Sequence, residues 1–284
     1  MLGSMVRTLF TVLVYAFAAI GFFLVFGYFA VRFGLTNEAG IIDVQREAFL
    51  AGGAGAPAAP PAADRDAAVP WSRTEEWSVL DAAIRKDAGT LARAADAAGV
   101  PARLIAANLV TEQLRLFFTE REFYKQFFSP LKILGAQTQF SWGVMGMKED
   151  TAIAVERHLK DPASPYYPGA AYERLLDFAA TDDAAIKQER FYRMTDQHDH
   201  YWSYLYAGLY LKEIEAQWRN AGYPIDDQPA ILATLFNIGF AHSAPNANPQ
   251  VGGAQIDVGG VSYSFGGLAG AFYASGLLAD VFPR

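Results

Sequence analysis

One carboxylic acid, Glu112, stands at the end of Pro101–Glu112, an apolar stretch that favours a helix. Two further stretches follow it: the Gly- and Met-rich run Phe140–Met147, and the run Ala233–Gly239, which contains Asn and Gly in turn-forming positions. A carboxyl group on a mostly apolar helix, walled in by such turns, can stay protonated and donate its proton to a glycosidic oxygen. These residues indicate general acid catalysis on a polysaccharide.

The neighbours of Glu112 leave a simpler alternative open. Asn108 and Arg115 lie at helical spacing from Glu112 and share its face. Ion pairs between Glu and Arg on one helix are common, so a structural pair is the default interpretation of an isolated helical Glu. An Arg beside the carboxyl favours its charged form, whereas a general acid has to be protonated. If Glu112 is catalytic, we expect Arg115 to point away from it or to bind substrate.

Four short motifs, taken in order, resemble those of the lysozyme-like lytic transglycosylases, the family of soluble lytic transglycosylases and goose-type lysozymes. Leu104–Gln113 is similar to the family's acid-bearing helix, Leu-Ile-x-Ala-x-Ile-x-x-Glu-Ser. Gly143–Ala152 follows Gly-Leu-Met-Gln-Leu-Met-Pro-x-Thr-Ala without a gap. Gly208–Leu211 resembles Gly-x-x-Tyr-Leu after a one-residue slip, and Leu235–Gly239 resembles Ala-x-Asn-x-Gly with an aromatic residue before the Asn. The resemblance covers roughly residues 87 to 240.

This resemblance implies an enzyme that cleaves the β-1,4 link between N-acetylmuramic acid and N-acetylglucosamine in peptidoglycan. Glu112 would protonate the glycosidic oxygen and then accept the proton of the C6 hydroxyl as a 1,6-anhydro ring closes. It also implies a sugar-binding cleft walled by residues of the second and fourth motifs: Ser141, Trp142, Gly143, Met145, Phe236 and Asn237. The indole of Trp142 is predicted either to stack on a sugar ring or to fill the core.

The sequence departs from the family motifs at four positions. Gln113 replaces the Ser after the acid, Gly146 the motif Gln, Glu149 the motif Pro, and Phe236 the Tyr that usually precedes the Asn. The changes at Gly146 and Phe236 remove an amide and a hydroxyl that the family uses near the acid and the sugar. A catalytically weak or inactive peptidoglycan-binding scaffold on the same fold is therefore an alternative.

Two further alternatives concern the chemistry of the site. A lysozyme-type hydrolase needs a second carboxylate about 5–9 Å from the acid. The motifs fix none, although Asp150, Asp196 and Asp199 are open candidates. A transglycosylase needs none, because the N-acetyl group and the C6 hydroxyl of the substrate do this work. In the remaining alternative, an unrelated membrane-tethered helical adaptor, Glu112 is structural.

The composition excludes several other functions. The formal net charge is −7 and the pI is near 5.1, whereas nucleic-acid binding usually needs a basic face. The chain has no Cys, and the two His of His198-Asp199-His200 would diverge on a regular helix. No metal, cofactor or nucleic-acid partner is expected. The aromatic residues between Phe191 and Tyr210 are predicted to be helical core.

The N-terminal residues predict a membrane anchor. Thr8–Val31 contains about 24 residues without a charge, which as a helix span roughly 36 Å, enough to cross a hydrocarbon core of about 30 Å. A cleaved signal peptide is the competing interpretation, but its apolar region is usually about 7–15 residues long. Residues 1–36 are predicted as a single-pass anchor in the inner (cytoplasmic) membrane, residues 37–70 as a juxtamembrane segment and Ala/Pro/Gly linker, and residues 71–284 as the catalytic domain in the periplasm. Its expected partners are peptidoglycan glycan strands and the membrane, and a cell-envelope complex stays open.

Apolar spacing and helix-stop residues predict an all-α, lysozyme-like domain. Leu80, Ile84 and Leu91 are spaced for a helix that Gly99 ends, and Pro101 suits the first turn of the next. One short β-hairpin is predicted within Gly252–Phe265. Further helices are predicted over Arg121–Phe128, Thr151–Leu159, Ala171–Phe178, Asp183–Arg219 with a break, Pro229–Phe236 and Phe265–Leu278.

Overall fold

The computed structural model describes residues 69–118 and 141–284, apart from residues 197 and 259. This part of the chain is mostly helical, which confirms the all-α class, and a continuous apolar core runs through it from Val69 to Phe282. Its α-helices are α3 (Glu75–Ala98), α4 (Ala102–Phe118), α6 (Glu149–Leu159), α7 (Asp183–Thr195), α8 (Tyr201–Asn220), α9 (Pro229–Ile238) and α10 (Phe265–Ala274).

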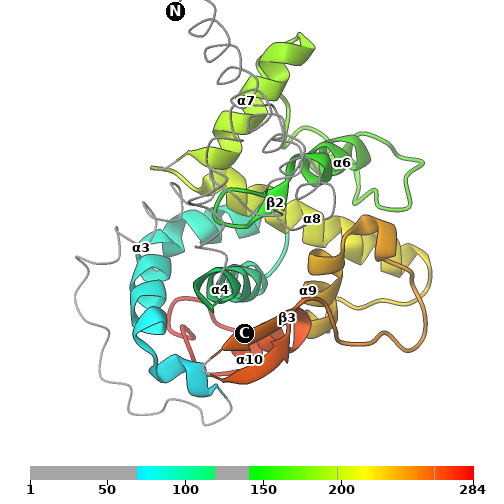
Figure 1. Ribbon diagram of the computed structural model, residues 1–284. Coiled ribbons are helices and arrows are strands. Elements are labelled where there is room, and N and C mark those ends of the chain that lie inside the picture. Colours follow the sequence, from blue (N-terminus) through cyan, green and yellow to red (C-terminus); the bar gives the residue numbers. More distant parts are fainter. Residues whose placement is uncertain (1–68, 119–140, 197, 259) are drawn as a thin grey trace, which may run out of the picture.

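Helix α4 lies at the centre of the fold, where α3, α8, α9 and α10 all contact it (Figure 1). Its side chains from Arg103 to Leu114 are all buried, as expected of a helix that is apolar on every face. The polar side chains within it bond to main-chain oxygens: Asn108 donates to Leu104 O and Thr111 to Ala107 O. The helix predicted to carry the acid is therefore the core of the molecule.

Helices α3 and α8 cross closely beside α4. Thr74 caps the start of α3 by accepting a hydrogen bond from the amide of Trp77, and Gly99 ends the helix in the left-handed conformation, with φ of 64°. At the crossing, a Cβ added to Gly208 of α8 would lie 2.7 Å from the Cβ of Ala98. Only a glycine allows this separation, so the second half of the fold packs directly on the helix pair α3–α4.

Two short hairpins accompany the helices. Strands β3 (Gln255–Val258) and β4 (Val261–Ser264) pair antiparallel, which confirms the hairpin predicted within Gly252–Phe265, and β3 packs against α4. A second, smaller pair was not predicted: β1 (Ser141–Trp142) and β2 (Met147–Lys148) enclose the turn Gly143–Gly146. Two-residue strands are too short to give an alternating pattern in the sequence.

The C-terminal residues are fastened to α4 by one buried arginine. The guanidinium of Arg103 donates five hydrogen bonds of 2.7–3.0 Å to main-chain carbonyl oxygens that end α10 or follow it: those of Phe272, Tyr273, Ser275, Leu277 and Phe282. The last carbonyls of an α-helix have no amide of the same helix to bond to, and Arg103 supplies donors to two of those of α10 and to three oxygens beyond it. The last 20 residues of the chain are thus an integral part of the core.

Of two other predictions about helices, the structure confirms one and contradicts the other. The break expected within Asp183–Arg219 is confirmed, with α7 and α8 on its two sides. The helix predicted over Ala171–Phe178 is wrong: the chain makes a single 3-10 turn at Ala170–Tyr172 and then irregular turns. Arg193 of α7 donates to the carbonyls of Leu176 and Asp177 in this segment.

Two of the predicted elements lie outside the described residues. They are the helix Arg121–Phe128 and the anchor Thr8–Val31. Within the described ranges, every helix is too short or too polar to cross a bilayer.

Candidate functional site

Glu112 is buried near the C-terminal end of α4 and is paired with an arginine of the same helix. Arg115 holds both carboxylate oxygens: Nη2 lies 2.5 Å from Oε1 and Nε lies 3.2 Å from Oε2. This two-point geometry is the strongest form of a Glu–Arg contact. Of the two outcomes expected for Arg115 in a catalytic site, pointing away is wrong in this structure, because its guanidinium covers the carboxylate.

The Gly143–Gly146 turn closes another side of the Glu112 carboxylate. A Cβ added to Gly146 would lie 2.2 Å from Glu112 Oε1, so the main chain of the turn touches the carboxylate directly. The next residue along α4 fixes the turn, since Gln113 Nε2 donates a 2.7 Å hydrogen bond to Val144 O. Gly143 and Gly146 both have positive φ, which glycine adopts freely. The first two family-like motifs therefore meet in space, as the resemblance implies.

Trp142 and Met145, two of the side chains that the resemblance places in a cleft wall, lie in the core. Trp142 is 1% exposed, and its indole packs edge-on against Phe191 of α7 at 5.5 Å between ring centroids. Of the two roles predicted for Trp142, this placement corresponds to core packing. Met145 is fully buried as well, while Ser141 and Gly143 contribute to β1 and to the turn. At Gly146 the main chain of this stretch lies against Glu112.

Phe236 and Asn237 belong to the last turn of α9, a helix that packs on α4. The ring of Phe236 contacts Tyr210 at 5.1 Å and Phe265 at 6.5 Å. Asn237 Oδ1 accepts a 2.8 Å hydrogen bond from the amide of Ala254, which joins α9 to the loop before β3. These contacts join the fourth motif to α8, α10 and this loop, so it supports the fold next to α4.

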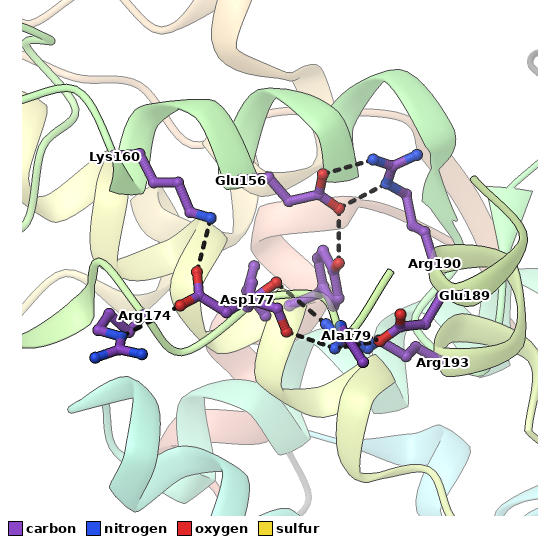
Figure 2. Close-up of polar contacts among 10 residues, drawn as sticks. Glu156, Lys160, Arg174, Asp177, Ala179, Glu189, Arg190 and Arg193 are labelled. Atoms are coloured by element: carbon purple, nitrogen blue, oxygen red, sulfur yellow. Dashed lines mark hydrogen bonds and ion pairs between the residues drawn. The ribbon is translucent and has the colours of Figure 1, made fainter. Parts of the chain in front are cut away.

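A buried ion pair anchors α6, the helix that follows the Gly143–Gly146 turn. Arg190 of α7 donates to both oxygens of Glu156, at 2.6 and 2.7 Å, and Tyr206 of α8 donates to Glu156 at 2.7 Å (Figure 2). Burial is the main cause that raises the pKa of the Tyr206 phenol, and the charge of Glu156 adds to it. One carboxylate therefore joins α6, α7 and α8 into one support for the turn.

Arg193 of α7 orders the irregular segment that follows α6. Its guanidinium lies between two rings, 4.5 Å from that of Phe178 and 4.1 Å from that of Trp202. It also pairs with Glu189 at 2.6 Å, and Glu189 accepts hydrogen bonds from the amides of Ala179 and Ala180 (Figure 2). Like Glu156 and Arg190, these residues hold neighbouring segments together, so their charges are explained without a catalytic role.

A second buried carboxyl, Glu213 of α8, was not singled out from the sequence. Its Oε2 lies 3.1 Å from Nδ1 of His158, whose ring stacks on Tyr166 at 4.5 Å and meets Phe240 edge-on at 4.6 Å. Burial raises the pKa of Glu213 well above its usual value and lowers the pKa of His158 to about 4. Burial thus favours the neutral form of both side chains.

Among the other charged residues considered from the sequence, Asp196 Oδ1 accepts hydrogen bonds from the amides of His198 and Asp199 in the turn before α8. His198 is exposed there, whereas His200 is buried with Nδ1 2.5 Å from Asp87 Oδ2. Asp150 opens α6 and Asp196 follows α7. In the described part of the chain, no three His, Asp or Glu side chains are grouped to hold a metal ion.

In the described geometry, the carboxylate of Glu112 on the central helix lies against a main-chain turn and is held at two points by Arg115. Such a site can hold a proton or release it, depending on whether the arginine stays in place. No protein-family model, curated protein or solved structure matches this chain significantly.

Proposed function

We propose that this protein is a membrane-anchored peptidoglycan lytic transglycosylase with Glu112 as its only catalytic carboxyl. The observation that carries the proposal is the meeting of Glu112 with the Gly143–Gly146 turn, two stretches that are about 30 residues apart in the sequence. A lysozyme-like site needs this arrangement, since the turn must border the acid. The predicted anchor Thr8–Val31 would hold the domain on the periplasmic face of the inner membrane.

In this reaction Glu112, once protonated, donates its proton to the oxygen between N-acetylmuramic acid and N-acetylglucosamine. The bond from C1 of the muramic acid to that oxygen breaks, and N-acetylglucosamine leaves with the proton. The substrate's own C6 hydroxyl then attacks C1, and the Glu112 carboxylate accepts the hydroxyl proton. The 1,6-anhydro ring closes without water, and Glu112 is again protonated.

The second candidate function is a peptidoglycan-binding scaffold on the same fold. Three observations favour it: Arg115 holds Glu112 as a carboxylate, Trp142 is buried, and Phe236 has no hydroxyl to offer a sugar. A scaffold would bind sacculi without cutting them, so product analysis separates the two functions.

The test is digestion of purified sacculi by the full chain in detergent, with fragments identified by mass spectrometry. Anhydro products, lighter than hydrolytic fragments by one water, are expected. Glu112→Gln keeps the shape of the side chain but has no proton to give, so the rate should fall by about 100-fold or more. The matched control is Glu215→Gln, because Glu215 is also buried and paired with a basic residue three positions away, Lys212.

Each other outcome selects a different function. Reducing-end products would reveal a hydrolase and direct attention to a second carboxylate. Binding to sacculi without fragments, unchanged by Glu112→Gln, would establish the scaffold. Equal loss of activity in Glu112→Gln and Glu215→Gln would mean that the substitutions act through folding.

A further inference from the structure

We propose that Asn108 is a positioning residue for the general acid, and that its side-chain oxygen accepts the hydrogen bond that a protonated Glu112 donates. The inference rests on the proposed function, because it concerns the proton that Glu112 carries in that reaction. Asn108 holds this proton on Glu112 until the glycosidic oxygen of the substrate takes over as the acceptor.

Asn108 has a buried side-chain oxygen without a described partner. The residue is fully buried in α4, and its Nδ2 donates a 2.9 Å hydrogen bond to Leu104 O. A carbonyl oxygen only accepts, so this bond places the amide nitrogen toward Leu104 and the amide oxygen away from it. Among the described residues, nothing donates a hydrogen bond to Oδ1 of Asn108. A buried polar atom of this kind is rare in folded proteins and costs stability.

The fold gains little from an asparagine at this position. Within α4 the carbonyl of Leu104 already accepts the backbone amide of Asn108, as in any α-helix, so the bond from Nδ2 only adds a second donor. Asparagine is a weaker helix former than leucine or alanine, and the neighbouring side chains of α4 are buried on every side. An apolar residue would therefore be more stable here, which indicates that Asn108 has a role other than stability.

Asn108 lies one turn before Glu112 on the same face of α4. Side chains four residues apart on a helix have Cβ atoms about 5–6 Å apart, and helical side chains lean toward the N-terminus, so Glu112 leans toward the turn of Asn108. Arg115 lies on the other side, with Nη2 2.5 Å from Oε1 of Glu112 and Nε 3.2 Å from Oε2. Oε2 is the more weakly held oxygen. It can take a proton and turn toward Asn108 while Oε1 keeps its contact with Nη2.

An acceptor beside Glu112 favours the acid form of its carboxyl group. A carboxylate only accepts hydrogen bonds and gains nothing from Oδ1 of Asn108, whereas a carboxylic acid has one hydrogen bond to donate. A hydrogen bond that only the protonated form makes stabilises that form. Arg115 acts in the opposite direction, because a cation favours the carboxylate. Asn108 thus offsets part of the effect of Arg115 and keeps a proton available for the reaction.

Other charged groups around α4 have partners of their own or are exposed. The Gly143–Gly146 turn and α9 contain no titratable side chain, α10 has only Tyr273, and Asp257 of β3 is exposed. Five carboxyls on α3, α6 and α8 are paired with basic side chains: Asp81 with Arg85, Asp87 with His200, Glu149 with Lys187 and Arg190, Glu213 with His158, and Glu215 with Lys212. Arg115 is therefore the described charge that Asn108 has to offset.

The experiment follows the protonation of Glu112 directly. The full chain in detergent, isotope-labelled at the glutamate carboxyl carbons, is titrated by NMR, and the Glu112 signal is identified by its loss in Glu112→Gln. In Asn108→Leu an apolar group of similar shape replaces the amide. We expect the midpoint of the Glu112 titration to fall by about one pH unit, the equivalent of one hydrogen bond. The unfolding midpoint in urea should not fall, because a polar group without a partner is removed.

Cutting of sacculi gives a second readout. At pH above the midpoint the rate should fall about 10-fold in Asn108→Leu, while at low pH, where Glu112 is protonated in any case, it should equal the wild-type rate. A merely structural defect would lower the rate at every pH. Asn108→Asp keeps an oxygen acceptor at the same position, so its midpoint should stay at the wild-type value or rise.

The matched control is Thr111→Val. Thr111 is buried in the same helix and also bonds to a main-chain oxygen four residues earlier, that of Ala107. It lies about 100° around the helix from Glu112, so its loss should leave the Glu112 titration unchanged. Asn108→Ala, whose smaller side chain cannot overlap its neighbours, carries the same prediction as Asn108→Leu if the latter does not fold.

Two results would overturn the inference. One is a Glu112 titration midpoint that is the same in wild type and in Asn108→Leu. The other is an equal shift of this midpoint in Thr111→Val. Failure of the proposed function looks different, because the wild-type chain would then release no fragments from sacculi at any pH, while the NMR titration would still decide the role of Asn108.

Discussion

Replacement of Arg103 tests how the central helix is held to the C-terminal segment. Arg103→Met keeps an unbranched side chain of similar length but removes all five hydrogen bonds to carbonyl oxygens of residues 272–282. The oxygens of Phe272 and Ser275 also accept hydrogen bonds from Ser275 and Arg284, but those of Tyr273, Leu277 and Phe282 would lose the donor that reaches them next to α4, where water has little access.

The magnitude follows from the kind of bonds that are lost. A hydrogen bond to a charged group contributes about 1.5–3 kcal/mol, but five bonds from one guanidinium are not additive, and Met no longer has a charge to bury. Removal of one member of a buried polar network typically costs about 3–5 kcal/mol. For a domain of about 200 residues, a loss of about 4 kcal/mol lowers Tm by roughly 8–16 °C.

Urea and thermal unfolding of the full chain in detergent, followed by circular dichroism at helical wavelengths, measures this loss. Limited proteolysis locates it, since residues 272–282 should become the first sites of cleavage. Arg93→Met is the matched control: Arg93 is exposed, lies over the ring of Tyr201 at 5.3 Å, and should cost at most about 1 kcal/mol. If Arg103→Met were as stable as Arg93→Met, the carbonyl oxygens would have other partners and the reasoning would be wrong.

Two further predictions concern the turn beside Glu112 and the pH dependence of stability. Gly146→Ala should destabilise the fold by about 2–4 kcal/mol in a urea titration, because φ is 60° and the new methyl group would overlap Glu112. The control Gly222→Ala, where φ is 85° but the space around the residue is open, should cost only about 1 kcal/mol in the same titration. The pKa of His158 falls in the folded state from 6.5 to about 4, so the stability that depends on a neutral His158 should be lost as pH falls from about 6.5 toward 4, and His158→Gln should remove this loss. The pKa of Glu213 is raised above 4.5 by burial, so its contribution is complete below about pH 4.5 and is lost as pH rises through the folded value. Glu213→Gln should flatten this decline, and a decline of unchanged slope would contradict the assignment.

Most of the helices could be predicted because their signals are local. Gly99 ends α3, Ser264 caps α10, and the apolar spacing of each helix is visible within one or two turns of sequence. The helix predicted over Ala171–Phe178 was wrong for the opposite reason. Its residues favour a helix, but the irregular turns found there are held by Arg193 and Glu189 of α7, which bond to main-chain groups between Leu176 and Ala180. A contact of that kind has no signature in the segment itself.

In the candidate site, too, local contacts could be predicted from the sequence and contacts between distant residues could not. Burial of Glu112 follows from the apolar residues around it, and its pairing with Arg115 follows from a spacing of three residues on one helix. The partners of Glu213 and Arg103 could not be predicted, since His158 is 55 residues from Glu213 and the carbonyl oxygens are 169–179 residues from Arg103. Burial of Trp142 against Phe191 also depends on where α7 packs.

Helix α4 carries two arginines that are held in different ways. Arg103 is fully buried, and its partners are five main-chain oxygens whose positions the fold sets, so these bonds cannot be lost without disturbing the C-terminal segment. Arg115 is partly exposed, and its described partner is a side chain of the same helix. Arg103 therefore joins the first turn of α4 to residues far along the chain, whereas the described contact of Arg115 stays within α4.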